Sequence, residues 1–577
     1  MTDRLFKSKH HHWGLPINSY PKLYSQLAIA ARGQTFSVFA EHYNWRSVAI
    51  ATISDICKLE QLAHQTHYVE TAAARITLQM LECVLELTRF PDEFENFALP
   101  SLVAGSIVLM SSVQPTPFFY EYGYLSFRIL IFSLNTCIIK HGQNLEFTVQ
   151  RMMNAAPGTH LSFFWQGAMD LLAVQLGSIP RLEKRLTNII NPSPQQLLIL
   201  ERSKLNMLLN LLDNSRKHFL AALITADSLQ LSGLMFILWK YLENERENMN
   251  KNVYNQKLLL PYSRIFRRYQ MVFPENNNET ELTRLIFVEL TNTSDLQVLQ
   301  EKPLTDIEDS RTAIHAYNRC LNTFQFLVIN DGVQHMNLLR LLFIPGCEDL
   351  LPSIMDSTFR MLWKTWPYSD MHTTIVAMRV CSGYICRFFQ EHVKALGTEP
   401  EPWRYDLVDT MIITDTLELA LRIMFTFSQS QDPSTARVTV DEVKITYDIM
   451  IALWQTIAAH TPEEYFGRRL RESGVLDRWN GYLLDLRERV YMEPSTRAII
   501  LPFSKSFAKE VAALSGVKWN DQPLGTQNSG TCNYLRCPHP TKASLGCSKC
   551  MNAVYCSARC LAKDWPSHAL VCRVPGL

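Results

Sequence analysis

Cysteines gather near the C-terminal end of this chain at spacings that suit metal binding. Seven of the 14 cysteines lie between positions 532 and 572 of the 577 residues. Pairs separated by two to four residues can direct both side chains at one ion, and zinc prefers four sulfur or imidazole ligands. A gap of three residues also places two ligands on one face of a helix, one turn apart. The four pairs are Cys532-x4-Cys537, Cys547-x2-Cys550, Cys556-x3-Cys560 and His568-x3-Cys572.

Zinc explains this cluster better than disulfide bonds do. Seven cysteines cannot all pair, a histidine at ligand spacing matches the odd one, and the N-terminus lacks an apolar run of signal-peptide type. Eight ligands close two tetrahedral sites and leave no open position for a catalytic water, so we expect two structural zinc ions. Spacing alone permits a sequential or an interleaved pairing, and His539 beside Cys537 could replace one ligand.

The residues around the last ligands resemble the MYND zinc finger. The specific elements are Tyr555-Cys556-Ser557 before Cys560, and Asp564-Trp565 before His568. All eight ligand positions are filled, and the resemblance covers residues 532–572. It implies a cross-braced finger with interleaved coordination, in which each zinc takes two pairs. One zinc would be held by Cys532, Cys537, Cys556 and Cys560, and the other by Cys547, Cys550, His568 and Cys572.

The same resemblance implies a protein partner or a short, proline-rich peptide. In the peptide-binding members, a Gln just after the sixth ligand and the Trp of the Asp-Trp element line the groove. This chain keeps Trp565 but has Leu561 at the position of that Gln. We therefore expect a more apolar groove with a different peptide specificity. The alternative for Trp565 is simple packing in the small core of the finger.

Helical periodicity dominates the chain from about residue 20 to residue 515. Apolar residues repeat at intervals of three and four from Ile76 to Leu87 and from Val443 to Ile457, which predicts two amphipathic helices. The stretch from Leu197 to Leu212 is apolar on more than one side and predicts a helix packed between others. A hydroxyl followed by proline predicts further helix starts at Ser193 and Thr461.

These patterns predict a mainly α protein with a small C-terminal zinc unit. Residues 1–515 would form an irregular multi-helical, α-solenoid-like scaffold, with an armadillo/HEAT-like array as one candidate and a compact helical domain as the alternative. Residues 516–531 are rich in Gly and polar side chains and predict a flexible linker, so we expect the finger to move independently. The finger at 532–572 and a tail at 573–577 complete the chain.

Composition argues against several classes of partner. Lys and Arg number 56 against 55 Asp and Glu, so the chain lacks the basic excess of a nucleic-acid-binding protein. The apolar stretches Ala98–Val113 and Ile129–Ile139 are interrupted or too short to span a membrane and indicate buried helices. The seven cysteines outside the cluster indicate inert buried thiols. The polar His10–His12 segment predicts a mobile tail and no metal site.

A non-enzymatic adaptor is the function that these features favour. The chain would bind zinc and a partner through its finger, inside the cell in the nucleus or the cytoplasm, with transcriptional regulation as a candidate role. The alternative is an enzyme with an unrecognised site in the helical region. A SET-type methyltransferase is disfavoured, because the faint Ile445–Asp448 match lies inside a helical stripe and no Asn-His-Ser-Cys motif occurs.

Overall fold

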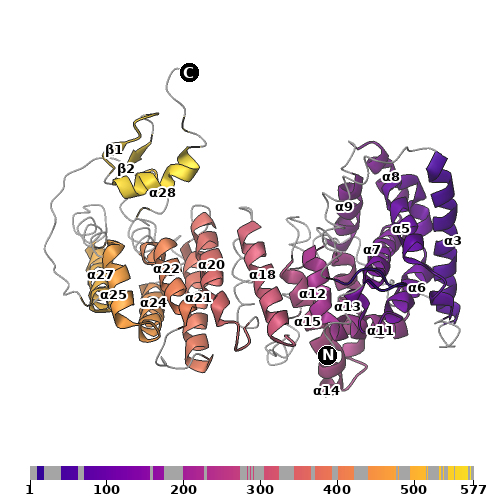
Figure 1. Ribbon diagram of the computed structural model, residues 1–577, viewed down its shortest axis with the longest axis horizontal. Coiled ribbons are helices and arrows are strands. Elements are labelled where there is room, and N and C mark those ends of the chain that lie inside the picture. The colour runs from indigo at the N-terminus through magenta and orange to yellow at the C-terminus, as the bar shows by residue number, and fades with distance from the viewer. Residues whose placement is uncertain are drawn as a thin grey trace. The chain divides into compact units, whose positions relative to one another are not determined.

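The computed structural model is mainly α-helical, with one small sheet near the C-terminus, and this confirms the predicted fold class (Figure 1). The chain divides into two compact units, residues 1–320 and 321–577. Apart from a few single residues, the structure describes 9–17, 40–62, 71–155, 160–173, 199–225, 231–272, 304–323, 343–365, 371–392, 401–420, 440–475, 494–514 and most of 532–572.

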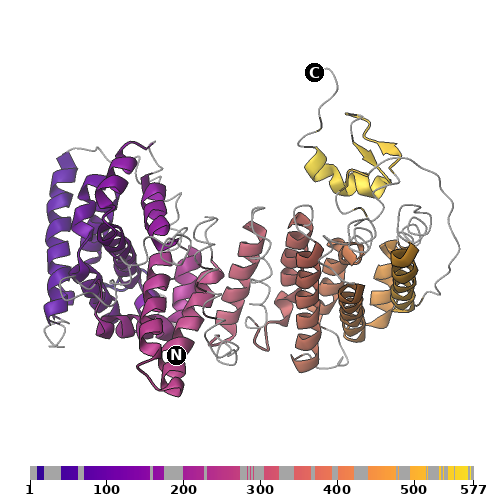
Figure 2. The ribbon, with the colours of Figure 1, turned by 180° about the vertical axis from the view of Figure 1, so that it is seen from behind.

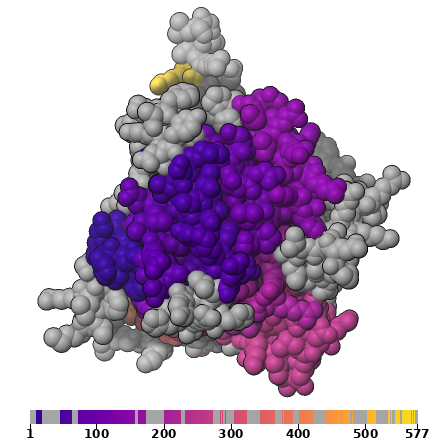
Figure 3. All heavy atoms as spheres, turned by 90° about the vertical axis from the view of Figure 1, so that its right-hand side faces the viewer, coloured from indigo at the N-terminus to yellow at the C-terminus, as the bar shows by residue number. Residues whose placement is uncertain are grey.

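The first unit is a group of helices drawn from indigo to magenta in Figure 2, and within it α7 packs against α5, α6, α9 and α13. α6 lies against both α7 and α3, and Gly105 permits the close approach because a Cβ there would lie 2.0 Å from the carbonyl oxygen of Ile56. In the space-filling view of Figure 3, the indigo atoms of α3 lie directly on the purple helices that follow. Its α-helices are α3 (Ala40–Leu62), α5 (Leu78–Glu86), α6 (Pro100–Ser111), α7 (Glu121–His141), α8 (Leu145–Met153), α9 (His160–Ala173), α11 (Arg202–Asn214), α12 (Arg216–Thr225), α13 (Ser232–Arg246), α14 (Lys251–Tyr254), α15 (Leu260–Gln270) and α18 (Ile307–Thr323). Shorter 3-10 turns are η2 (Leu87–Arg89), η3 (Pro91–Phe97) and η4 (Pro117–Phe119), and a π-helical turn, η7 (Asn255–Leu259), joins α14 to α15.

Helix α7 is the buried centre of this unit. Within it, Arg128, Lys140 and His141 are the residues that are not buried. By length and composition α7 is the one single helix in the described ranges that could cross a membrane, although 94% of its most apolar window is buried in the protein. The stretch Ile129–Ile139 was expected to be too short to span a membrane. That expectation was wrong, because the helix continues on both sides of it. The expectation of a buried helix is confirmed.

Residues 9–17 pack against the start of α7, so the prediction of a mobile histidine tail was wrong. The ring of His10 stacks on the ring of Trp13 at 4.3 Å. The backbone N–H of Tyr122 donates to the carbonyl of Trp13 at 3.0 Å, and the N–H of Leu15 donates to Glu121 Oε2 at 3.1 Å. These aromatic and backbone contacts anchor a segment whose polar composition had indicated solvent exposure.

A buried ion pair joins α15 to α18 in the first unit. Arg268 Nη2 donates to Asp309 Oδ2 at 2.5 Å, and the two side chains are 1% and 0% exposed. The backbone N–H and the hydroxyl of Thr305 also donate to this carboxylate oxygen, at 2.9 and 3.1 Å. Burial lowers the pKa of Arg268, and the charge of Asp309 opposes that shift. The pair is therefore shielded from water, and each buried charge is stabilised by the other.

The second unit consists of paired helices and the cysteine-rich segment. α21 packs along α24, α20 along α22, and α24 along α27. Trp363, Trp454 and Trp479 are fully buried, and the indole N–H of Trp363 donates to the carbonyl of Thr414 at 2.8 Å. The elements are η8 (Glu348–Leu350), α20 (Leu351–Thr365), α21 (Met371–His392), α22 (Pro402–Ile413), α24 (Val440–Ala459), α25 (Glu463–Glu472), α27 (Pro494–Leu514), β1 (Leu545–Gly546), β2 (Val554–Tyr555) and α28 (Ala558–His568).

Local sequence patterns predicted helix identity better than helix ends. α24 contains the whole predicted stripe from Val443 to Ile457, and α5 lies within the predicted stretch from Ile76 to Leu87 but does not reach either end of it. Thr461 does not cap α25, because its hydroxyl donates back to the carbonyl of Ile457 at 2.9 Å. The predicted helix from Leu197 begins only at Arg202, in α11.

Some predictions stay open. The predicted start at Ser193, the tail at 573–577 and all of the 516–531 linker except Gly516 lie outside the described residues. The solenoid-like or armadillo/HEAT-like arrangement of the scaffold stays a prediction.

Candidate metal centre

A short hairpin and one helix position the predicted ligands. β1 and β2 pair antiparallel, with Leu545 opposite Tyr555 and Gly546 opposite Val554. Ser557 caps α28, because its hydroxyl accepts the backbone N–H of Cys560 at 3.2 Å. The turn after Cys560 then carries the helix on to His568. The hairpin and α28 therefore bring ligands from the two ends of the segment close together.

The ligands form two groups, and the pairing is interleaved. The first group is Cys532, Cys537, Cys556 and Cys560, and the second is Cys547, Cys550, His568 and Cys572. Within each group the ligand atoms all lie within 4.8 Å of one another. This is the arrangement implied by the resemblance, and not the sequential pairing. His539, the alternative ligand, lies outside the described residues.

Distances in both groups suit a tetrahedral zinc. In the first group, Cys556 Sγ lies 3.3 Å from Cys537 Sγ and 3.4 Å from Cys560 Sγ. In the second group, Cys547 and Cys572 hold their sulfurs 3.9 Å apart. A tetrahedral zinc with Zn–S bonds of about 2.3 Å requires sulfurs about 3.8 Å apart. Small inward or outward movements of the side chains would complete both coordination shells.

The electrostatics of the clustered thiols also call for a cation. Hydrogen bonding with Cys537 lowers the pKa of Cys532, and the same contact raises the pKa of Cys537. Four adjacent sulfurs therefore cannot all ionise without a positive charge between them. In the second group, the backbone N–H groups of Cys550 and Lys549 lower the pKa of Cys547 to about 6. The donor set thus fits two divalent zinc ions, which hold thiolates and keep no open position.

The cysteines outside the finger have a different character. All are free thiols, and all but the half-buried Cys57 are buried. Burial raises the pKa of Cys137 and of Cys381 to about 12. Cys137 and Cys381 therefore stay protonated at neutral pH and are poor nucleophiles, as the sequence predicted.

The finger has a small core of its own besides the ligands. Tyr555 is fully buried, and its hydroxyl donates to Asp564 Oδ2 at 2.8 Å. Burial is the main cause that raises the pKa of Tyr555, and the charge and hydrogen bond of Asp564 add to it. Leu561 packs against this core and is half-buried. Tyr555, and not Trp565, is therefore the large aromatic residue at the centre.

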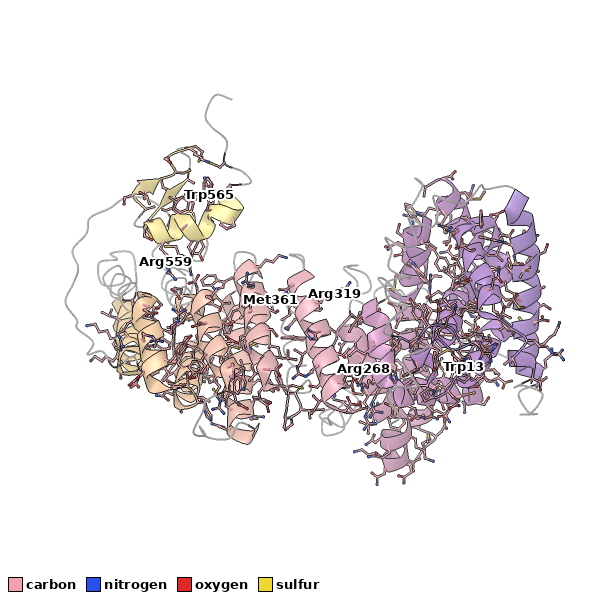
Figure 4. The ribbon with its side chains drawn as sticks, viewed as in Figure 1. Trp13, Arg268, Arg319, Met361, Arg559 and Trp565 are labelled. Carbon is pink, nitrogen blue, oxygen red and sulfur yellow. The ribbon has the colours of Figure 1, made fainter. Side chains whose placement is uncertain are left out.

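Trp565 lies at the surface of the finger. Its side chain is 36% exposed, its ring meets the ring of His568 at 5.9 Å, and Lys549 Nζ lies 5.0 Å from its centroid. Figure 4 shows Trp565 on one side of α28 and Arg559 on the side that faces the helices of the second unit. A partly exposed indole can receive an apolar group.

The finger contacts the helices of its unit, contrary to the expected independence. Tyr534 donates its hydroxyl to Asp415 Oδ2 at 2.8 Å. Arg559 Nη2 lies 2.8 Å from Asp415 Oδ1 and 3.3 Å from Glu418 Oε1, and Lys563 also pairs with Asp415. Sequence reasoning missed these two acids, because nothing near positions 415 and 418 marks them as a docking point. The linker's composition had suggested free movement but could not reveal this contact.

Comparison with known proteins supports the assignment of the segment. The family model of the MYND finger matches residues 532–572. No curated protein and no solved structure matches the chain. The two interleaved ligand groups, their distances and this match agree. Residues 532–572 are a MYND zinc finger, a zinc-binding module of the kind that mediates protein interaction.

Proposed function

We propose that this protein is a non-enzymatic intracellular adaptor that holds a peptide segment of a partner protein against the Trp565 face of its finger. The observation that carries the proposal is the partly open indole on α28. Two structural zinc sites with no open coordination position support a binding role over a hydrolytic one. The proposed location is the nucleus or the cytoplasm. The role that we propose for the adaptor is in transcriptional regulation.

The periodicity of α28 supports a division of its surface into two faces. Arg559 and Lys563 are four residues apart and share the face that contacts Asp415. Leu561 and Trp565 are also four residues apart, on a face rotated by about 200° from the first. Contact with the helices of the second unit therefore leaves the Trp565 face accessible. The finger can contact these helices and bind a peptide at the same time.

The chemistry of this face favours an extended apolar segment. Trp565 offers an aromatic surface for a proline or another apolar side chain, and Leu561 adds aliphatic area beside it. A Gln at this position would add an amide able to hydrogen-bond the peptide backbone, and Leu561 cannot. Lys549, whose Nζ lies 5.0 Å from the centroid of the indole, favours an acidic group next to the apolar anchor.

The charges of the finger support a protein partner over a nucleic acid. Six basic residues follow position 531, and two of them, Arg559 and Lys563, are already paired with acids of the helical unit. The remaining cations are too few for the phosphate contacts that drive nucleic-acid binding. These cations are Arg536, Lys542, Lys549 and Arg573.

Replacing Trp565 with alanine should weaken peptide binding without loss of metal. Truncating an aromatic anchor costs about 2 kcal/mol, so the dissociation constant should rise roughly thirtyfold. The probe is a peptide selected by the wild-type chain from a library of extended proline-rich sequences. Isothermal titration would measure affinity, and elemental analysis would confirm an unchanged zinc content.

Leu545→Ala is the matched control, since Leu545 is a 39% exposed apolar residue on β1 and not on α28. It should leave the affinity unchanged. Unchanged affinity in Trp565→Ala, with zinc retained, would place the binding surface elsewhere. Zinc loss in that variant would show that Trp565 is a core residue and would remove the basis of the proposed face.

A further inference from the structure

Two buried acids of the second unit form a socket that the finger covers. Asp415 directly follows the C-cap residue of α22, and its side chain is 1% exposed, while that of Glu418 is 4% exposed. Asp415 has a φ of 55°, in the left-handed region that Asp tolerates better than most residues. Its N–H donates to the carbonyl of Ile412 at 3.2 Å, and Trp363 binds the neighbouring carbonyl of Thr414 at 2.8 Å. Hydrogen bonds within the helices of the second unit therefore hold the socket in place.

Three donors of the finger satisfy this socket. Asp415 Oδ2 accepts the hydroxyl of Tyr534, and Oδ1 accepts Arg559 and Lys563. Glu418 Oε1 accepts both terminal nitrogens of Arg559 at 3.3 Å. Burial disfavours the charge of Arg559, but Glu418 and Asp415 raise its pKa above the ordinary value. Buried carboxylates are costly without such partners, so docking and coverage of the acids stabilise each other.

The donors belong to one zinc site more than to the other. Tyr534 lies between the ligands Cys532 and Cys537, and Arg559 lies between Cys556 and Cys560. Lys563 follows Cys560 by three residues on α28. All four of these ligands belong to the first group.

The second group surrounds a different part of the surface. Lys549 lies between its ligands Cys547 and Cys550, and the ring of Trp565 packs on its ligand His568. None of the three socket donors lies inside the Cys547–Cys550 pair or the His568–Cys572 pair of this group, although α28 also carries His568 at its last residue. The two metal sites thus support two separate surfaces of the finger.

We propose that metal in the Cys532/Cys537/Cys556/Cys560 site holds the finger on the Asp415/Glu418 socket, so that loss of this ion releases the finger and exposes the two acids. The Cys547/Cys550/His568/Cys572 site instead supports the Trp565 face. The first site is therefore a latch between the finger and the helices, and the socket is occupied by Tyr534, Arg559 and Lys563 of the chain itself.

Carboxylate labelling of the full-length protein tests this directly. Carbodiimide and an amine nucleophile modify exposed carboxylates, and mass spectrometry locates the products. Asp415 and Glu418 should be protected in the wild type. The control carboxylate is Asp409, on α22 just before the socket and paired with Arg469 at 2.7 Å, and its labelling should not change in any variant.

Two kinds of variant separate the latch from general folding. Arg559→Gln with Lys563→Gln removes the charged donors and leaves every ligand, so labelling of Asp415 and Glu418 should rise about tenfold with two zinc ions retained. Cys560→Ser should produce the same rise through loss of the first metal. Cys572→Ser, at the second site, should leave the labelling of both acids within about twofold of the wild-type value. Loss of one charge-assisted contact corresponds to a change of about tenfold, so the two results can be told apart.

Each other outcome overturns the proposal. Protected acids in Cys560→Ser would show that the first metal does not hold the finger. Equal labelling in Cys560→Ser and Cys572→Ser would show that docking depends on the finger as a whole. Protection that persists in the Arg559/Lys563 double variant would show that these side chains do not form the latch. None of these readouts depends on peptide binding, so the proposed adaptor role is tested separately.

Discussion

Removal of zinc is expected to unfold residues 532–572 while the helices of the first unit stay folded. The core of the finger besides its ligands consists of Tyr534, Ala543, Ala553 and Tyr555, with little aliphatic area to bury. Binding of a structural zinc is worth about 10–16 kcal/mol, and this free energy is folding free energy. Hydrogen exchange of the full chain, with and without a chelator, should show loss of protection in α28 and none in α7.

Acid should have the same effect as the chelator. Zinc lowers the pKa of its thiol ligands below the value of about 8.5 for a free cysteine. The stabilisation is therefore fully present above that value and is lost as the pH falls through the lowered pKa of the bound thiols. Re-addition of zinc at neutral pH should restore protection. Retained protection of α28 in metal-free protein would contradict the view that metal supplies the folding energy.

Asp309→Ala is expected to cause a large loss of stability in the first unit. The variant leaves Arg268 charged and buried at 1% exposure, without its carboxylate partner. Breaking a buried ion pair on one side costs about 3–5 kcal/mol. The hydrogen bonds from Thr305 are lost as well. Urea unfolding, followed through hydrogen exchange in α15, would give the change in the free energy of unfolding.

A surface pair provides the control for this effect. Asp55 and Lys58 on α3 form an ion pair at 2.8 Å, with side chains 49% and 62% exposed. Exposed pairs contribute about 0–1 kcal/mol, so Asp55→Ala should be nearly neutral. The prediction fails if Asp309→Ala lowers the free energy of unfolding by no more than Asp55→Ala does. Water or a neighbouring side chain would then compensate the charge of Arg268, and burial would not be the reason why this pair stabilises the unit.

The finger was predictable because its information is local. Each ligand pair lies within a few residues, and only a few types of side chain bind zinc, so spacing alone located all eight ligands. The choice left open for Trp565, between the groove and the core, concerned burial, which depends on the fold. The structure places Trp565 at the surface and Leu561 half-buried beside the core.

Longer-range features were not predictable from these patterns. Asp415 and Arg559 meet across 144 residues of sequence, and a lone acid gives no sign of such a partner. Thr461 has the residue type of a helix cap, but its hydroxyl donates to a carbonyl of the preceding helix, which is the other local hydrogen bond open to a Thr side chain. The His10–His12 segment is polar, yet the rings of Trp13 and Tyr120 pack 5.6 Å apart and help to hold it in place. In each case a tertiary contact decides between two local options.

Native mass spectrometry of the full-length, reduced protein tests the two-zinc finger most directly. Two zinc ions should be found for each chain, since both interleaved ligand groups are complete. In Cys532→Ala, one ion should bind more weakly while the other stays bound at the Cys547 site. One zinc or none in the folded wild-type protein would contradict the two-site finger on which the binding face and the latch both rest.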